Sequence, residues 1–178
     1  MIGISKLYCG QVEPSDALRY GRESGRLPSH LLQFSRDKKP VVVWNMTRRC
    51  NLKCVHCYAQ AVDPHQGGDD IGTEQAKAMI DDLAAFGAPV MLFSGGEPLV
   101  RKDDLIALCN KHQDCEFLCF TNATLIDEDF ACQMLRVKNF IPAISVEGFQ
   151  EATDGRRGEG VFQQVRRAME ILKARKLP

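Results

Sequence analysis

Three cysteines stand close together in the stretch MTRRCNLKCVHCYAQ, which runs from Met46 to Gln60. Their spacing is C-x3-C-x2-C, with the thiols at Cys50, Cys54 and Cys57. Thiolates bind iron–sulfur clusters and zinc, and cysteine is also a small residue that is often buried. The pattern therefore leaves three interpretations: a metal or iron–sulfur site, a redox site, or one buried face of a helix, where residues i, i+4 and i+7 lie together.

The neighbours of the cysteines favour metal binding. Arg48, Arg49 and Lys53 flank the thiols, whereas a core stripe would have apolar neighbours. Cations lower the pKa of a thiol and so favour the thiolate, which is the form that binds metal. A structural zinc site needs four protein ligands, but only three thiols cluster here and His56 abuts Cys57. An iron–sulfur cluster on three thiolates keeps one iron open for a small molecule, while zinc completed by a distant cysteine stays the alternative.

A second motif, LFSGGEP at residues 92–98, contains groups that suit a ligand site. Gly95 and Gly96 allow the backbone to approach a ligand closely, and Pro98 stiffens the chain that follows. The carboxylate of Glu97 can accept a hydrogen bond from an ammonium group. Taken alone, this run is equally well explained as a turn, so its meaning depends on where the fold places it.

Strands and helices that alternate from residue 40 onward must position these motifs. Apolar, β-branched runs predict strands at 41–46, 89–94, 116–121 and 140–148. Apolar residues at helical spacing predict helices at 73–86, 102–111, 127–136 and 161–175. Such an order predicts an α/β fold with a parallel sheet covered by helices. The two motifs follow the first and second strands, so they are expected to converge at the carboxyl edge of the sheet.

The two ends of the chain follow different patterns. Residues 1–39 are polar and punctuated by glycine and proline, which predicts an N-terminal extension with short helices at 15–20 and 30–34 before a core domain at 40–178. The last residues, ARKLP, end a helix where a fifth strand is expected. A sheet of four parallel strands leaves an exposed edge, so either a partner closes it or the sequence is a fragment of a longer chain, which is the interpretation we favour.

Composition restricts the class of protein. Lys plus Arg and Asp plus Glu each number 23, and the resulting net charge of zero argues against broad electrostatic binding to nucleic acid or to an anionic membrane. The sequence shows neither a secretory signal nor an apolar run of membrane-spanning length, which predicts a cytoplasmic protein. In a cytoplasmic chain, 8 cysteines indicate metal binding or catalysis rather than a disulfide framework.

With both motifs in this strand order, the sequence resembles the radical S-adenosylmethionine (SAM) superfamily from residue 40 to the end. The resemblance implies a partial (β/α) barrel of about four of the family's six units, with a short N-terminal extension. It implies a [4Fe-4S] cluster held by Cys50, Cys54 and Cys57, whose open iron binds the amino and carboxylate groups of SAM. Transfer of one electron to SAM would then give a 5′-deoxyadenosyl radical that takes a hydrogen atom from the substrate.

The resemblance also implies a set of cofactor-binding residues. The methionine end of SAM is expected at Gly95, Gly96 and Glu97, and further contacts are expected from His56, Tyr58, Thr121, Asn122, Ser145 and Glu147. FTNATL is similar to the family's TNGT pattern but has Ala123 in place of glycine. ISVEG is similar to the family's S-x-D-G pattern but has Glu147 in place of aspartate, and without the resemblance this segment is equally well explained as a solvated turn.

Residues 1–100 resemble most closely the haem-biosynthesis branch of the superfamily, which includes 12,18-didecarboxysiroheme deacetylases and haem d1 biosynthesis enzymes. This resemblance implies an enzyme that removes a side chain from a sirohaem-derived tetrapyrrole and receives electrons from a ferredoxin or flavodoxin. Arg49 and Arg101 are candidates to bind substrate carboxylates, although each is equally well explained as a solvated charge. The alternatives are a peptide-modifying radical SAM maturase and a non-catalytic iron–sulfur module.

Four later cysteines match no ligand spacing that we recognise: Cys109, Cys115, Cys119 and Cys132. Cys119 alternates with Phe117 in a predicted strand, which indicates a buried packing residue. An auxiliary cluster bound by these four cysteines stays the alternative.

Overall fold

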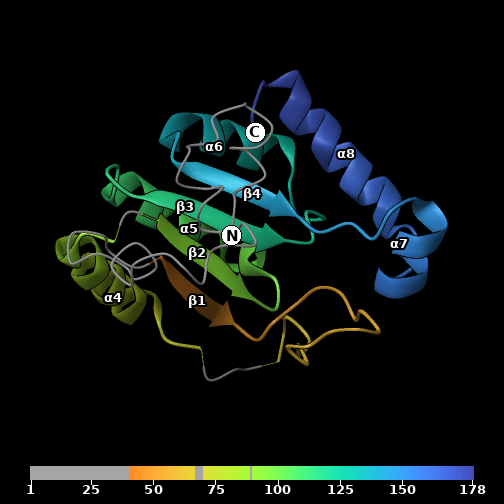
Figure 1. The fold of residues 1–178 in the computed structure, drawn as a ribbon, viewed down its shortest axis with the longest axis horizontal. Coiled ribbons are helices and arrows are strands. Elements are labelled where there is room, and N and C mark those ends of the chain that lie inside the picture. The colour runs from red at the N-terminus through yellow and green to blue at the C-terminus, as the bar shows by residue number, and fades with distance from the viewer. Residues whose placement is uncertain (1–40, 67–69, 89) are drawn as a thin grey trace, which may run out of the picture. The chain divides into compact units, whose positions relative to one another are not determined.

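A parallel sheet forms the centre of the structure (Figure 1). The computed structural model describes residues 41–66, 70–88 and 90–178, all in the unit Val41–Pro178. The strands pair in the order β1-β2-β3-β4, with bounds Val42–Thr47, Val90–Gly95, Glu116–Thr121 and Phe140–Ile144. The helices are α4 (Thr73–Phe86), the 3-10 turn η2 (Pro98–Arg101), α5 (Lys102–Lys111), α6 (Glu128–Val137), α7 (Gln150–Arg157) and α8 (Val161–Ala174). The predicted α/β architecture is confirmed.

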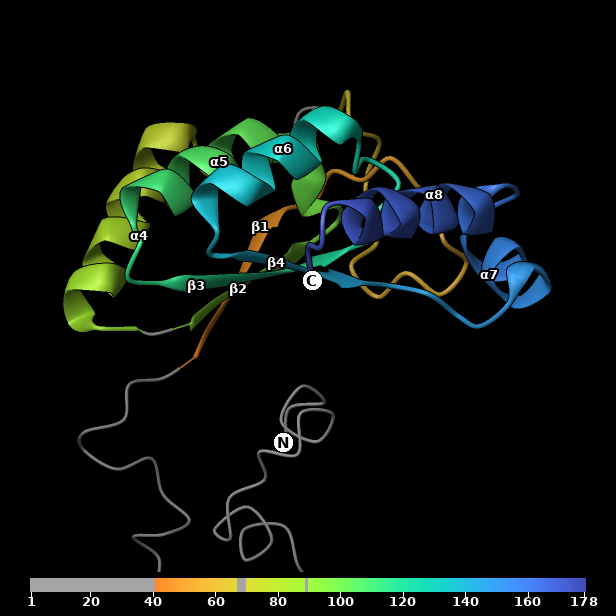
Figure 2. The same cartoon turned by 90° about the horizontal axis from the view of Figure 1, so that it is seen from above.

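Helices cover one face of this sheet. Figure 2 shows α4, α5 and α6 side by side on one face, and the described part of the chain places no helix against the other. The two faces of the sheet differ because successive side chains along a strand point to opposite faces. Phe93 and Phe117 are fully buried on the face that the helices cover, where their rings stack with centroids 5.4 Å apart. Their neighbours Leu92 and Leu118 pair across β2 and β3 and are only partly buried.

The sheet ends earlier than the sequence predicts, and one helix was not predicted. The expected strand at 140–148 was wrong at its end, because β4 stops at Ile144. The Ser145 N–H still donates to the Thr121 carbonyl at 2.9 Å, but Thr121 is the last residue of β3, so the ladder has no further partner. Helix α7 was missed because Thr153 is its one buried residue, which leaves no apolar period to recognise.

Some expectations lie outside the described residues. Residues 1–40 are not among the described residues. They include the helices expected at 15–20 and 30–34 and the domain boundary expected at residue 39. Among the residues that are described, no helix is long and apolar enough to cross a membrane.

Candidate cofactor site

A pocket of about 150 Å³ lies where the chain leaves the carboxyl ends of all four strands. Its lining includes most of the site residues predicted from the sequence: Cys50, Cys54, His56, Cys57, Tyr58, Gly95, Gly96, Glu97, Thr121, Asn122 and Ser145. Arg157 from α7 also lines it. A larger cavity of about 780 Å³, bounded by residues at the starts of α4 and α5, contains none of the cysteines. The smaller pocket is therefore the place where the two motifs meet.

The two glycines of the second motif lie against the backbone that leads into the cysteines. The Gly96 N–H donates to the Thr47 carbonyl at 2.7 Å, and the Glu97 N–H donates to the Arg49 carbonyl at 2.8 Å. A Cβ atom on Gly96 would lie 2.3 Å from the Arg49 oxygen, and one on Gly95 would lie 2.3 Å from the Thr47 oxygen. Gly95 also has φ +129°, a conformation that favours glycine. The close approach of the two loops therefore depends on both glycines.

Glu97 is a carboxylate held in a fixed position at the base of the pocket. Its side chain is buried, with 1% of the residue exposed. Oε1 accepts hydrogen bonds from Thr121 Oγ1 at 2.7 Å and from the Leu99 N–H at 2.9 Å, and Oε2 accepts one from the Asn122 N–H at 2.7 Å. Burial raises the pKa of Glu97, while these three donors favour the ionised form. Because Oε2 accepts one bond, it has capacity for a further donor.

The side chains of Thr121 and Asn122 contact protein groups. Thr121 donates to Glu97, as described above, and its Oγ1 accepts from the Ala123 N–H at 2.9 Å. Asn122 Nδ2 donates to Asn51 Oδ1 at 2.9 Å and lies 3.9 Å from Cys50 Sγ. The end of β3 thus builds the pocket by holding Glu97 and the cysteine loop in place.

The three thiols suit an iron–sulfur cluster as ligands, although they are not yet gathered as a coordination set. Cys50, Cys54 and Cys57 are free and partly buried, and burial raises the pKa values of Cys50 and Cys54. Within residues 41–66, 70–88 and 90–178, no three His, Cys, Asp or Glu side chains already form a metal site. Ligands often adopt their final arrangement and lose their protons only when metal binds. Three soft donors around one pocket, beside a carboxylate with spare acceptor capacity, fit a cluster with one open iron.

Comparison with protein families agrees with this geometry. Residues 44–178 match the family model described as the radical SAM superfamily. The chain belongs to the radical SAM superfamily. Members of this superfamily are enzymes that use a [4Fe-4S] cluster and SAM.

Similar radical SAM proteins include two with names from haem metabolism. The Fe-coproporphyrin III synthase of Methanosarcina barkeri is 57% identical over 171 residues, which cover 95% of this chain and 43% of the relative. The pre-heme d1 synthase of Dinoroseobacter shibae is 37% identical over 129 residues, covering 71% of this chain and 31% of the relative. The chain thus spans less than half the length of these relatives.

A solved structure, anSMEcpe with bound AdoMet, is similar to this chain with a TM-score of 0.63 and 26% sequence identity. The match covers 77% of this chain and 41% of the anSMEcpe chain. The same protein has also been solved with AdoMet and a peptide, Cp18Cys.

In this radical SAM fold, α7 is tied to the outer part of the cysteine loop. The Val55 N–H donates to the Arg156 carbonyl at 2.9 Å. Glu147 accepts from Arg157 Nη2 at 2.5 Å and lies 3.2 Å from His56 Nε2. The hydrogen bond from Arg157 lowers the pKa of Glu147. The sequence predicted Glu147 as a cofactor contact, but the structure places it outside the pocket lining, in contact with Arg157 and His56.

The candidate substrate-binding arginines, Arg49 and Arg101, are not among the residues that line the pocket of the three thiols. Arg101 is buried, donating from Nε to Asp104 at 2.9 Å and from Nη1 to the Met46 carbonyl at 3.1 Å. Arg49 donates from Nε to Asp70 at 3.0 Å. Both line the larger cavity. Both side chains thus bind groups of the protein itself.

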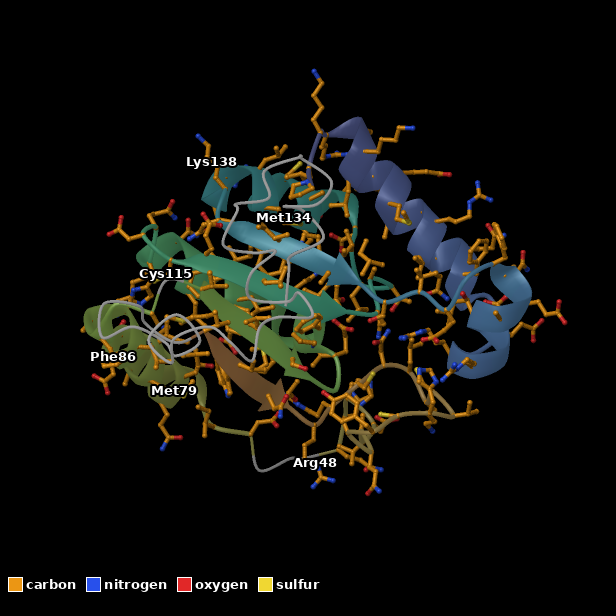
Figure 3. The ribbon with its side chains drawn as sticks, in the orientation of Figure 1. Arg48, Met79, Phe86, Cys115, Met134 and Lys138 are labelled. Atoms are coloured by element: carbon orange, nitrogen blue, oxygen red, sulfur yellow. The ribbon has the colours of Figure 1, made fainter. Side chains whose placement is uncertain are left out.

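The other cysteines in the described residues are separate from the radical SAM pocket. Cys109, Cys115 and Cys119 are buried and Cys132 is exposed. Burial raises the pKa of Cys109 to about 12, which keeps this thiol protonated. Figure 3 places Cys115 at the opposite end of the sheet from Arg48, which lies by the cysteine loop. The predicted burial of Cys119 is confirmed, since none of it is exposed.

Sequence reasoning missed three residues that support the site: Asn51, Thr124 and Arg157. Asn51 stands between two of the predicted ligands, and Thr124 ends the run TNAT, so proximity to the motifs was an available signal for both. Arg157 lies in the unpredicted helix α7, and no sequence pattern connects it with the pocket.

Proposed function

We propose that this chain carries the cofactor-binding part of a radical SAM enzyme, with Cys50, Cys54 and Cys57 as the ligands of its [4Fe-4S] cluster. One observation supports this proposal above the others: the three thiols and Gly95, Gly96 and Glu97 line a single pocket, although 38 residues or more separate the two motifs in sequence. The cluster and SAM together supply one-electron chemistry that removes a hydrogen atom from the substrate.

In this proposal the protein holds and orients SAM. Glu97 Oε2, which accepts one hydrogen bond from the Asn122 N–H, accepts another from the SAM ammonium group. Gly95 and Gly96 let the backbone approach the methionine end. Tyr58, whose hydroxyl lies 3.2 Å from Ser94 Oγ, lines the same pocket and packs on the cofactor.

Other pocket residues complete the cofactor contacts. His56 supplies backbone beside the adenine, and Ser145 contacts the SAM ribose or sulfonium. Both residues line the same pocket as the thiols. Thr121 and Asn122 act on SAM indirectly, through Glu97 and the cysteine loop. Glu147 acts by holding Arg157 and His56.

The substrate that we propose is a sirohaem-derived tetrapyrrole from which the enzyme removes a side chain. The name of the relative with 57% identity states that its product is Fe-coproporphyrin III, an iron tetrapyrrole. Phe120 lines the pocket and is 43% exposed, and on β3 it alternates with the buried Cys119 and Thr121, so its side chain lies on the face away from the core. The flat ring of a tetrapyrrole can pack on such an apolar surface next to the cofactor.

We propose a ferredoxin or flavodoxin as the electron donor and the cytoplasm as the location. Iron–sulfur ligation needs reduced thiols, and the reducing cytoplasm keeps thiols in that form.

The main rival is a peptide-modifying maturase. The structure of anSMEcpe with AdoMet and a peptide supports it, since that protein matches this chain with a TM-score of 0.61. A non-catalytic iron–sulfur module is the rival from another class.

Anaerobic reconstitution with iron and sulfide tests the cofactor assignment. We expect the wild-type protein to develop cluster absorbance, and the separate substitutions Cys50→Ala, Cys54→Ala and Cys57→Ala to abolish most of it. Cys109→Ala and Cys132→Ala are the matched controls and should retain the cluster. Cluster loss in the controls with retention in the three variants would refute the assignment.

Product analysis by mass spectrometry separates the three functions. With SAM and a chemical reductant, we expect 5′-deoxyadenosine together with a sirohaem-derived tetrapyrrole that has lost side-chain mass. Modification of a peptide alone would favour the maturase. A cluster that forms without 5′-deoxyadenosine would favour the non-catalytic module.

A further inference from the structure

A closed ring of hydrogen bonds joins the end of β3 to the cysteine loop. Its members are Asn51, which follows the first cysteine of the motif, and Asn122 and Thr124, which follow β3. The ring brings together side chains that are 71 residues apart in sequence. One of its members, Asn122, lines the pocket and is only 6% exposed.

The direction of each bond in the ring is determined by the backbone. The Thr124 N–H can only donate, and it donates to Asn122 Oδ1 at 3.0 Å, which identifies that atom as oxygen. Asn122 Nδ2 therefore faces the loop and donates to Asn51 Oδ1 at 2.9 Å. Asn51 Nδ2 then donates to Thr124 Oγ1 at 2.8 Å, and Thr124 Oγ1 donates to Asn122 Oδ1 at 2.7 Å.

One N–H of Asn122 has a sulfur atom as its partner. Asn122 Nδ2 has two hydrogens, of which one bonds Asn51, and Cys50 Sγ lies 3.9 Å away from the nitrogen. Oδ1 already accepts two bonds from Thr124. All the hydrogen-bonding groups of this amide are thus used, and one of them is directed at a proposed cluster ligand.

We propose that Asn122 is a positioning residue that orients Cys50 and, through an N–H···S hydrogen bond, raises the reduction potential of the bound cluster. A hydrogen bond to a ligand sulfur stabilises the more negative, reduced cluster. The ring prevents the amide from turning away, because rotation would break the bonds to Thr124 and Asn51 together. This inference rests on the proposed cluster ligands.

The test compares two substitutions that add the same charge to the ring. Asn122→Asp keeps the acceptor oxygen for Thr124 and removes the donor to Cys50. Asn51→Asp adds a carboxylate beside the same cysteine and leaves that donor in place. The measurements are the reduction potential, from a redox titration followed by electron paramagnetic resonance, and iron retained under a chelator.

We expect the equilibrium constant for reduction to fall about tenfold or more in Asn122→Asp, which corresponds to about 59 mV for one electron. The shift in Asn51→Asp should be clearly smaller. Asn122→Asp should also lose iron to the chelator about tenfold faster. Asn139→Ala controls for general destabilisation and should leave the reduction potential unchanged. It removes a buried side-chain amide that donates to the carbonyls of Cys109, His112 and Cys115.

Equal shifts in the two Asp variants, or no shift in either, would overturn the inference. If Asn122→Asp does not fold, Asn122→Ala removes the same donor to Cys50 without adding a charge, and an unchanged potential in that variant would also overturn the inference. Absence of any cluster in the wild-type protein would instead refute the proposed function.

Discussion

Single residues set the distance between the two cofactor loops. Gly96 is the sharpest example, because its backbone N–H bonds Thr47 while the position of its missing side chain is occupied by the Arg49 carbonyl. The backbone N–H of the next residue, Glu97, donates to that same Arg49 carbonyl. A displacement of the backbone at Gly96 would therefore move both the Glu97 carboxylate and the chain that enters Cys50.

We predict that Gly96→Ala destabilises the fold by about 3 kcal/mol and sharply reduces iron incorporation, since the added Cβ must displace backbone atoms. Urea unfolding and iron content per chain measure the two effects. Gly155→Ala is the matched control: a Cβ there meets nothing within 4 Å, and alanine favours helix α7. A Gly96→Ala protein as stable and iron-rich as this control would contradict the prediction.

Ala123 occupies a strained position between Asn122 and Thr124. Its φ of +62° lies in the left-handed region, which costs an L-residue about 1 kcal/mol or more. This turn lets the Thr124 N–H reach back to Asn122 Oδ1. Glycine, which the related TNGT pattern has at this position, adopts such a φ without this strain.

We predict that Ala123→Gly stabilises the protein by about 0.5 to 1 kcal/mol, because glycine removes the left-handed strain at some entropic cost. Ala131→Gly in the interior of α6 should instead destabilise it by about 1 kcal/mol or more. Urea denaturation of both variants gives the comparison. A loss of stability in Ala123→Gly would show that the turn is not strained in solution.

At the scale of elements, α7 contributes to the site although it contains no predicted ligand. It accepts the Val55 N–H at its carboxyl end and, through Arg157, holds Glu147 beside His56. The helix thereby ties the segment between Cys54 and Cys57 to the chain after β4. This contact is local, so its loss should loosen the loop far more than it destabilises the fold.

We predict that Glu147→Gln speeds hydrogen exchange at the Val55 amide while changing the free energy of unfolding by no more than about 1 kcal/mol. Hydrogen–deuterium exchange measures the local effect. Glu170→Gln, which breaks the exposed Arg166–Glu170 pair on α8, is the control and should leave Val55 unchanged. Equal protection of Val55 in both variants would argue against a role for Glu147.

The same contact predicts a dependence on pH. The folded-state pKa of Glu147 is lowered from 4.5, because Arg157 stabilises the carboxylate. Its stabilisation is therefore fully present above the unfolded pKa and is lost as the pH falls through the lower, folded pKa. The difference in Val55 exchange between wild type and Glu147→Gln should accordingly disappear below that range.

At the scale of the whole described unit, the sheet has one face covered by helices and one face that the described residues leave without a helix (Figure 2). Val43 on β1 is 60% exposed, and Phe120 on β3 and Ile141 on β4 are partly exposed as well. This apolar surface borders the cofactor pocket through Phe120. Such a surface suits an apolar substrate and favours self-association when it is free.

We predict that Val43→Lys reduces self-association, because a charge on an exposed strand opposes edge and face pairing, while stability changes by about 0.5 kcal/mol or less. Light scattering as a function of protein concentration provides the measurement. Met169→Lys adds the same charge on α8, where the side chain is also exposed, and serves as control. Equal reduction in both variants would assign the effect to net charge.

The sequence by itself determined the alternation of strands and helices, the parallel sheet, the carboxyl-edge location of both motifs and the three thiols that line the pocket. These features depend on local patterns: the period of apolar residues predicts each element, and parallel strands place their ends together. The tertiary structure alone decided which groups Arg101, Asn122 and Glu147 contact, and it alone placed Arg157 at the pocket. Their partners are distant in sequence, as with Asn122 and Asn51, and only the folded chain brings such groups within hydrogen-bonding distance.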